Sequence, residues 1–148
     1  MAGDAANDPA NGAASHAASD DDRFRRGWAK LQEVDGAAAE RVMTALQDIA
    51  PDLGRYIVEF AYGDVYAHPG LDNRTREIVT VSALAAMGNA QPQLKIHIHA
   101  ALNVGCTRPE IVEIMMQMAV YAGFPAALNG MFAAKDVFAE RDAAGKTN

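Results

Sequence analysis

A histidine that could transfer protons, His97, falls on the apolar face of a predicted helix. With about 100° of rotation per residue, its side chain lies beside those of Leu94 and Ile98. His99 points about 200° away, toward the polar arc, so the two imidazoles cannot bind one metal ion. A buried imidazole needs hydrogen-bond partners and is easily tuned for proton transfer. Two interpretations of His97 remain open, a hydrogen-bonded core histidine and a catalytic acid or base. His99 suits solvent or an interface.

A carboxylate, Glu77, opens the most apolar helical segment of the chain and shares a face with Val81 and Leu84. A carboxylate that faces a core is costly unless it is paired or protonated. The first turn of a helix also offers it the favourable end of the helix dipole. Glu77 could therefore form a structural ion pair with Arg74 or Arg76. Alternatively, it could be an acid or base that faces a histidine across two packed helices.

Four further residues are candidates for binding a substrate. Arg74 and Arg76 lie near the start of the same helix, where free amides favour anions, and two guanidinium groups could hold a carboxylate. Solvated surface charges are the alternative for both. Tyr62 and Tyr66 are four residues apart and share a helix face, as the wall of a pocket would require. The spacing of the histidines excludes a zinc site, and the sequence has no glycine-rich phosphate loop.

The elements that position these residues are predicted to be helices throughout, so the fold class is all-α. Apolar residues recur every three or four positions, and no strand-like alternation appears. A break is expected at Asp35 and Gly36, and Asp72 is expected to cap a helix over 73–87. Thr107 and Glu110 form the pattern of a capping box. Further helices are expected over about 51–66, 91–104 and 126–141, in a compact subunit of about six helices.

The chain of 148 residues is long enough for one domain with its own core. Residues 1–22 hold no large apolar side chain after Met1, so they cannot bury enough surface to offset their ordering entropy. We expect a disordered tail over 1–22, one helical domain over 23–142 and a flexible C-terminus over 143–148.

Charge and cysteine content narrow the class of protein. Five of the 19 acidic residues lie within residues 1–22, which leaves 14 acidic against 13 basic residues in the remainder. A nearly neutral body without a basic cluster is not expected to bind nucleic acid or an anionic membrane. The single cysteine, Cys106, excludes an internal disulfide and a Cys-x-x-Cys site. No apolar run reaches the roughly 18 residues of a membrane span, and no secretory signal is present. A reduced cytoplasmic compartment is therefore expected.

One segment suggests self-association. From Ile78 to Met87 the chain is apolar around the full circumference of a helix apart from Thr80 and Ser82, which predicts a central buried helix. A body of this size has little surface with which to cover that helix and the methionine-rich segment 115–118 as well. A symmetric homo-oligomer would cover both. Complete burial within one subunit is the alternative.

Residues 55–140 resemble the carboxymuconolactone decarboxylase family, which shares the alkylhydroperoxidase D-like helical fold. The matching stretches are residues 60–66, 69–72, 74–77, 94–97, 101–105 and 121–127. The resemblance implies an all-α subunit that assembles into a homo-trimer or homo-hexamer. It also implies a reaction of the β-ketoadipate route that needs no cofactor and no metal. In that reaction 4-carboxymuconolactone, a small carboxylated lactone, loses carbon dioxide to give 3-oxoadipate enol-lactone.

The resemblance also implies roles for residues of this chain. His97 falls on the family's histidine and becomes the expected proton donor, with Glu77 as its exchange partner. The residues then expected to bind substrate are Arg74, Arg76, Tyr62, Tyr66 and His99.

The chain departs from the family's decarboxylases at four positions. Those enzymes resemble one another in having Trp at the position of Tyr66 and Arg at the position of His68. They also have Ser at the position of Glu77 and Arg at the position of His99. The loss of two cationic positions weakens recognition of a dianion. Peroxidase members of the fold have glutamate and histidine at the positions of Glu77 and His97, but they also use a Cys-x-x-Cys. The corresponding segment here, residues 89–93, holds no thiol, which excludes that chemistry. A changed substrate and a non-catalytic oligomer that binds a small ligand are the alternatives to a decarboxylase.

Overall fold

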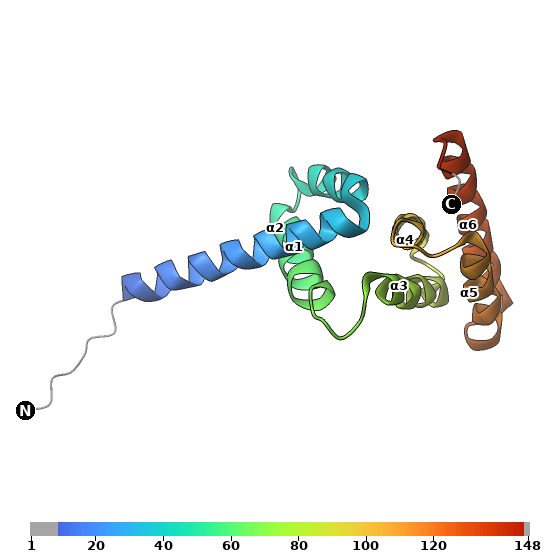
Figure 1. Cartoon of the computed structure of the whole chain (residues 1–148), viewed down its shortest axis with the longest axis horizontal. Coiled ribbons are helices and arrows are strands. Elements are labelled where there is room, and N and C mark those ends of the chain that lie inside the picture. Colours follow the sequence, from blue (N-terminus) through green and yellow to red (C-terminus); the bar gives the residue numbers. More distant parts are fainter. Residues whose placement is uncertain (1–8, 147–148) are drawn as a thin grey trace, which may run out of the picture.

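The computed structural model describes residues 9–146, and over that range every regular element is a helix, which confirms the all-α class. Figure 1 shows their order along the chain. The elements are α1 (Pro9–Leu46), α2 (Pro51–Tyr56), the π-helix η1 (Ile57–Tyr66), α3 (Asn73–Met87), α4 (Gln91–Asn103), α5 (Arg108–Tyr121) and α6 (Phe124–Ala143).

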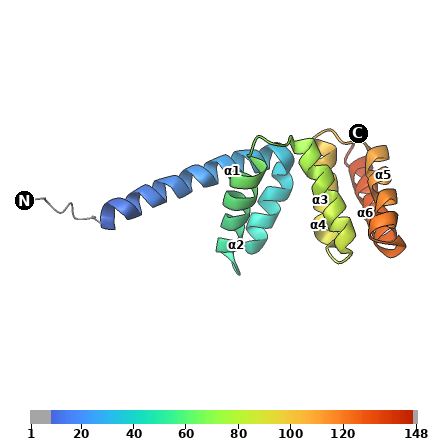
Figure 2. The ribbon, with the colours of Figure 1, turned by 90° about the horizontal axis from the view of Figure 1, so that it is seen from below.

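The helices form two groups that meet at α4. A hairpin of α3 and α4 lies in the middle, with α5 and α6 on one side and α1, α2 and η1 on the other (Figures 1 and 2). One buried core, which includes Val81, Ile98 and Met115, joins α3 to α6. A second core, which includes Leu31 and Val58, joins α1 to η1, and α4 contributes Ala100 to it. Helices of the two groups therefore face each other across the seam between the cores.

Helix α1 bends at Asp35, whose backbone dihedral angles (φ −158°, ψ 79°) are not helical. Its carboxylate accepts a hydrogen bond from the Ala38 amide at 3.2 Å and so caps the second arm of the helix. The bend lies at the break that the sequence predicted. In Figures 1 and 2 the N-terminal part of the first arm extends away from the other helices, and its later part lies against η1.

The N-terminal segment differs in part from the predicted tail. Helix α1 begins at Pro9, so residues 9–22 are helical in the structure, whereas residues 1–8 lie outside the described residues. The segment is rich in alanine, the best helix former, and it continues a helix that packs further along the chain. At the other end α6 continues to Ala143, and residues 147–148 lie outside the described residues. The domain limits at residues 22 and 142 stay predictions.

Two helix starts have the caps that the sequence predicted. The Asp72 side chain accepts a hydrogen bond from the Thr75 amide at 2.7 Å, and α3 has the predicted bounds of 73–87. Thr107 and Glu110 form both halves of a capping box at the start of α5. These caps are local in sequence, which is why they could be recognised without the fold.

The predicted helix over residues 51–66 is divided in the structure. Residues 51–56 form α2, and residues 57–66 form η1, in which the turns are wider than in an α-helix. The Ala67 amide accordingly donates to the Tyr62 carbonyl, five residues earlier, at 3.0 Å. π-Helical turns are rare and occur frequently at functional sites.

Helices α1 and η1 cross with their backbones in direct contact. A Cβ atom on Gly27 would lie 1.9 Å from the Val58 carbonyl oxygen, and one on Gly63 would lie 2.7 Å from the Arg23 carbonyl oxygen. Beside the crossing, Arg23 forms an ion pair with Asp64 at 2.5 Å. The absence of side chains at the two glycines lets η1 approach α1 closely and so fixes where η1 places its tyrosines.

The isolated subunit leaves large apolar side chains open to solvent. Helix α3 is buried along one stripe, whereas Val79 and Met87 are 57% and 62% exposed. Complete burial of this segment within one subunit, one of the two alternatives from the sequence, is therefore wrong. Tyr121 and Phe124, near the turn between α5 and α6, are 77% and 74% exposed. Over the described residues, no helix combines the length and the apolar character that a membrane span requires.

The α1–η1 crossing predicts that Gly27→Ala destabilises the protein by about 1–3 kcal/mol, because the new methyl group would have to push two backbones apart. Gly36→Ala is the matched control, since its Cβ would meet only the flexible end of the Gln32 side chain. Thermal melts of both variants test this. An unchanged melting temperature for Gly27→Ala would contradict the close crossing.

Candidate active site

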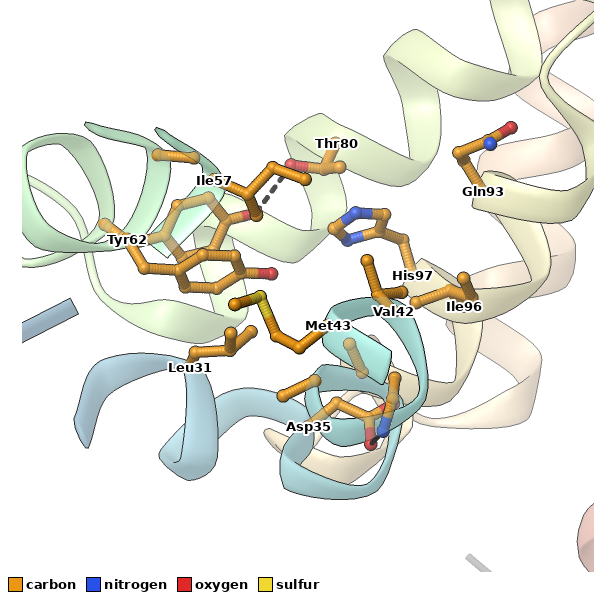
Figure 3. Close-up of a pocket in the computed structure, with 15 residues that line it drawn as sticks. Leu31, Asp35, Val42, Met43, Ile57, Tyr62, Thr80, Gln93, Ile96 and His97 are labelled. Carbon is orange, nitrogen blue, oxygen red and sulfur yellow. Dashed lines mark hydrogen bonds between the residues drawn. The ribbon is translucent and has the colours of Figure 1, made fainter. Parts of the chain in front are cut away.

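A cavity of about 350 Å³ lies between the two groups of helices, with walls from α1, η1, α3 and α4. Figure 3 shows its lining, in which aliphatic side chains predominate. The polar or titratable side chains among the lining residues are those of Asp35, Tyr62, Tyr66, Thr80, Gln93 and His97. Within residues 9–146, no lysine or arginine is part of the lining.

Behind one wall of the cavity, Glu77 is wholly buried, with 0% of its surface exposed. Its Oε1 accepts a hydrogen bond from the Tyr66 hydroxyl at 2.9 Å, and its Oε2 lies 2.9 Å from Nδ1 of His97. The structure therefore brings together the two residues that the sequence placed on apolar faces of neighbouring helices. The two partners replace the water that a buried carboxylate loses.

A hydroxyl chain extends this network. The Tyr66 hydroxyl also lies 2.9 Å from Oγ1 of Thr80, and Figure 3 shows this contact as a dashed line. Because the single Tyr66 proton is donated to Glu77, the Thr80 hydroxyl donates to Tyr66. The two hydroxyl groups thus form a chain of donors that ends at the carboxylate.

The His97 imidazole connects the buried carboxylate to the cavity. Its side chain lines the cavity and is 21% exposed, whereas its Nδ1 faces Glu77. When Glu77 is ionised, Nδ1 must carry the proton that this hydrogen bond needs. Among the described residues Nε2 has no hydrogen-bond partner, so it is the nitrogen left for a bound molecule.

Tyr62 and Tyr66 share one face of η1, as the sequence predicted, with ring centroids 4.7 Å apart. The Tyr62 hydroxyl has no hydrogen-bond partner within the described part of the chain, and in Figure 3 it points into the space beside His97. Burial raises the pKa of Tyr62 and of Tyr66, and the Glu77 carboxylate raises both further. Both phenols therefore stay protonated at neutral pH and can act as donors.

Neither arginine that the sequence singled out lines the cavity. The Arg74 guanidinium pairs with Glu110 at the start of α5. Arg76 donates to the His68 carbonyl at 2.7 Å, and its guanidinium lies 5.7 Å from the centroid of the Tyr66 ring. Their role as carboxylate ligands stays a prediction, which these positions do not favour.

His99 also lies outside the lining of the cavity. Its Nε2 is 3.0 Å from Glu140 on α6, so the side chain faces the opposite side of α4 from His97. This agrees with the polar arc on which helical geometry placed it. Its expected part in lining the pocket stays a prediction without support from its position.

Thr80 and Gln93 line the cavity, but the sequence analysis did not propose them as site residues. Each has a sequence signal in hindsight. Thr80 interrupts an apolar run three residues after Glu77, and Gln93 precedes His97 by four residues. Residues three or four apart share a helix face, so both belong to the same wall as the proton-transfer pair.

Other reactive groups lie apart from this site. Within the described range, no group of three or more His, Cys, Asp or Glu side chains is arranged to hold a metal ion. Cys106 is buried outside the cavity, and its burial raises the pKa of the thiol. A protonated buried thiol is a poor nucleophile.

Comparisons with known proteins agree with this architecture. Residues 51–136 match the carboxymuconolactone decarboxylase family. A 4-carboxymuconolactone decarboxylase of Acinetobacter baylyi is 35% identical over 120 residues, 80% of this chain and 89% of that protein. An uncharacterized 15.0 kDa protein of Paracoccus denitrificans is 34% identical over 101 residues, 68% of this chain and 75% of its own. A nitrosuccinic acid decarboxylase of Metarhizium robertsii is 33% identical over 100 residues, 66% of this chain and 69% of its own.

The network predicts different costs for removing the two tyrosine hydroxyl groups. Tyr66→Phe deprives a buried carboxylate of a donor and should lower the free energy of unfolding by about 1.5–3 kcal/mol. Tyr62→Phe removes a hydroxyl that serves no protein group and should leave stability nearly unchanged. Denaturant titrations of the two variants beside wild type give the comparison. Equal losses would contradict the hydrogen-bond assignment.

Proposed function

Because the chain belongs to the carboxymuconolactone decarboxylase family, we propose that it is a cofactor-independent carboxy-lyase that acts on a small carboxylated lactone. The observation that carries this proposal is the contact between the buried Glu77 and His97 at the wall of a largely apolar cavity. Two relatives, from A. baylyi and M. robertsii, are named decarboxylases of different substrates, which supports the reaction class more than any one substrate.

In the proposed reaction the bond between a ring carbon and its carboxylate breaks, and carbon dioxide leaves. The electron pair stays on the lactone and delocalises into its carbonyl, which gives a dienolate. His97 then donates a proton to a different carbon, and Glu77 stabilises the positive charge of the imidazolium before that step. Water returns the proton to His97. No electron transfer is involved, so the residues at hand suffice for the proton movements.

The substrate that we propose first is 4-carboxymuconolactone, which yields 3-oxoadipate enol-lactone. A changed substrate is the second candidate, and a specific observation favours it: none of the lysines and arginines that the structure describes lines the cavity, where it could neutralise a dianion. A non-catalytic oligomer that binds a small ligand remains the contrasting hypothesis. It predicts that Glu77→Gln lowers stability while no substrate is turned over by wild type.

We also propose that the subunit assembles into a homo-trimer or homo-hexamer. Exposed apolar side chains on several helices, among them Val79, Met87 and Phe124, support an interface between copies of this chain. A cytoplasmic location stays a prediction from the sequence.

This assembly has a direct test in light scattering coupled to size-exclusion chromatography. We expect a mass of three or six subunits of 15.7 kDa. A monomeric mass at micromolar concentration would contradict the proposal.

The proton-transfer role predicts that His97→Ala lowers turnover of 4-carboxymuconolactone by about 100-fold or more, because the variant lacks the proton donor. The change in ultraviolet absorbance of the substrate measures the rate. His99→Ala is the matched control, since His99 pairs with Glu140 outside the cavity. It should keep wild-type turnover.

Normal turnover by His97→Ala would overturn the role of this residue. If correctly assembled wild type leaves 4-carboxymuconolactone unchanged, the first substrate is wrong. A panel of smaller carboxylated lactones then tests the changed-substrate alternative.

A further inference from the structure

The charged groups that line the cavity are better suited to an uncharged substrate than to a dianion. Its lining holds one group that can become cationic, His97, and one carboxylic acid, Asp35, on the opposite helix. The two arginines that the sequence proposed as carboxylate ligands have other partners: Arg74 pairs with Glu110, and Arg76 donates to the His68 carbonyl. Most of the remaining lining is aliphatic. Such a site binds an uncharged organic molecule without having to strip water from a carboxylate.

A donor on a buried side chain in the cavity, the Tyr62 hydroxyl, is unused by the protein. Tyr62 is 8% exposed, and its hydroxyl has no hydrogen-bond partner among the residues that the structure describes. The neighbouring hydroxyl of Tyr66 is committed to Glu77 and Thr80. The Tyr62 hydroxyl is not among the buried polar atoms that lack a partner, so it is accessible from the cavity and free to donate to a ligand oxygen there. Figure 3 shows it directed into the same space that His97 lines.

A phenol donor beside a proton carrier in an apolar cavity is an arrangement that stabilises an enolate. The phenol donates to the carbonyl oxygen as negative charge develops there, and it does so without bringing in a full positive charge. Burial raises the pKa of Tyr62, so it remains a donor rather than becoming an anion itself. The imidazole, backed by Glu77, can take a proton from a carbon acid and return it.

We propose that this cavity binds uncharged unsaturated lactones and catalyses migration of their ring double bond, with Tyr62 as the oxyanion donor and His97 as the proton carrier. This inference rests on the proton-transfer pair of the proposed function, but it needs no carboxylate on the substrate. It therefore names a second substrate class and a second activity for the same site.

The reaction balances by moving one proton. Nε2 of His97 removes a proton from the carbon next to the lactone carbonyl, and the electron pair of that C–H bond forms a dienolate. The Tyr62 hydroxyl donates a hydrogen bond to the enolate oxygen throughout. His97 then returns the proton to the far end of the conjugated system, the carbonyl re-forms, and the double bond has moved by one position. The dienolate resembles the one left by loss of carbon dioxide, so one constellation serves both reactions.

The test uses the full-length protein with 5-methyl-2(3H)-furanone, an uncharged lactone with an acidic C–H beside its carbonyl. Proton NMR in deuterium oxide follows both deuterium uptake at that carbon and formation of the 2(5H)-furanone isomer. We expect wild type to accelerate both over buffer. Tyr62→Phe should lower the rate by about 100-fold, the usual effect of losing one oxyanion donor. Tyr56→Phe is the matched control, because Tyr56 is exposed and lies outside the cavity.

A wild-type rate equal to that of buffer would overturn the inference, as would a Tyr62→Phe variant as fast as wild type. Parallel assays with 4-carboxymuconolactone separate the two proposals: decarboxylation without exchange contradicts only this inference, and exchange without decarboxylation supports only this inference. If Tyr62→Phe does not fold, a binding experiment tests the inference instead. Wild type and Tyr56→Phe are titrated with 4-nitrophenolate, a planar mimic of the enolate. Saturable binding that inhibits exchange supports the inference, and its absence contradicts it.

Discussion

A wholly buried carboxylate is the constraint on which the rest of this structure depends. Glu77 has no contact with solvent, so its two oxygens must find donors within the protein. Tyr66 comes from η1 and His97 from α4, whereas Glu77 lies in α3, just beyond the first turn in which the sequence placed it. Three helices are thereby held in one relative position. The two partners of Glu77, Tyr66 and His97, line the cavity, so stability and chemistry share the same hydrogen bonds.

Hydrogen bonds to both oxygens of Glu77 offset the free energy lost when the carboxylate is removed from water. The same hydrogen bonds determine which groups remain available in the cavity. Tyr66 and His97 contact the carboxylate directly, and Thr80 contacts the Tyr66 hydroxyl. The Tyr62 hydroxyl and Nε2 of His97 lie in the same cavity and have no protein partner among the described residues. In apolar surroundings, hydrogen bonds from such groups are stronger than in water. A site of this kind stabilises a delocalised dienolate better than it binds a substrate with two negative charges.

Features that depend on residues close together in the sequence could be predicted. Contacts between residues far apart in the sequence could not. Asp72 and the Thr107–Glu110 capping box act within one turn, so these helix starts were predictable. The Glu77–His97 contact was one of two open alternatives, because each lay on an apolar face without its partner being known. Arg74 was assigned to substrate, but the fold brings it to Glu110, 36 residues away. The π-helical geometry of η1 has no counterpart in its residue types and depends on packing against α1.

The central claim is that Glu77 holds His97 with its proton on Nδ1 and its Nε2 available to a ligand. Nitrogen-15 NMR of the imidazole tests this most directly, with the His97 signals assigned by comparison with His97→Gln. The account predicts, at a pH where the ring is neutral, a protonated Nδ1 and an unprotonated Nε2, with this preference lost in Glu77→Gln. A neutral ring protonated on Nε2, with signals unchanged by Glu77→Gln, would contradict it.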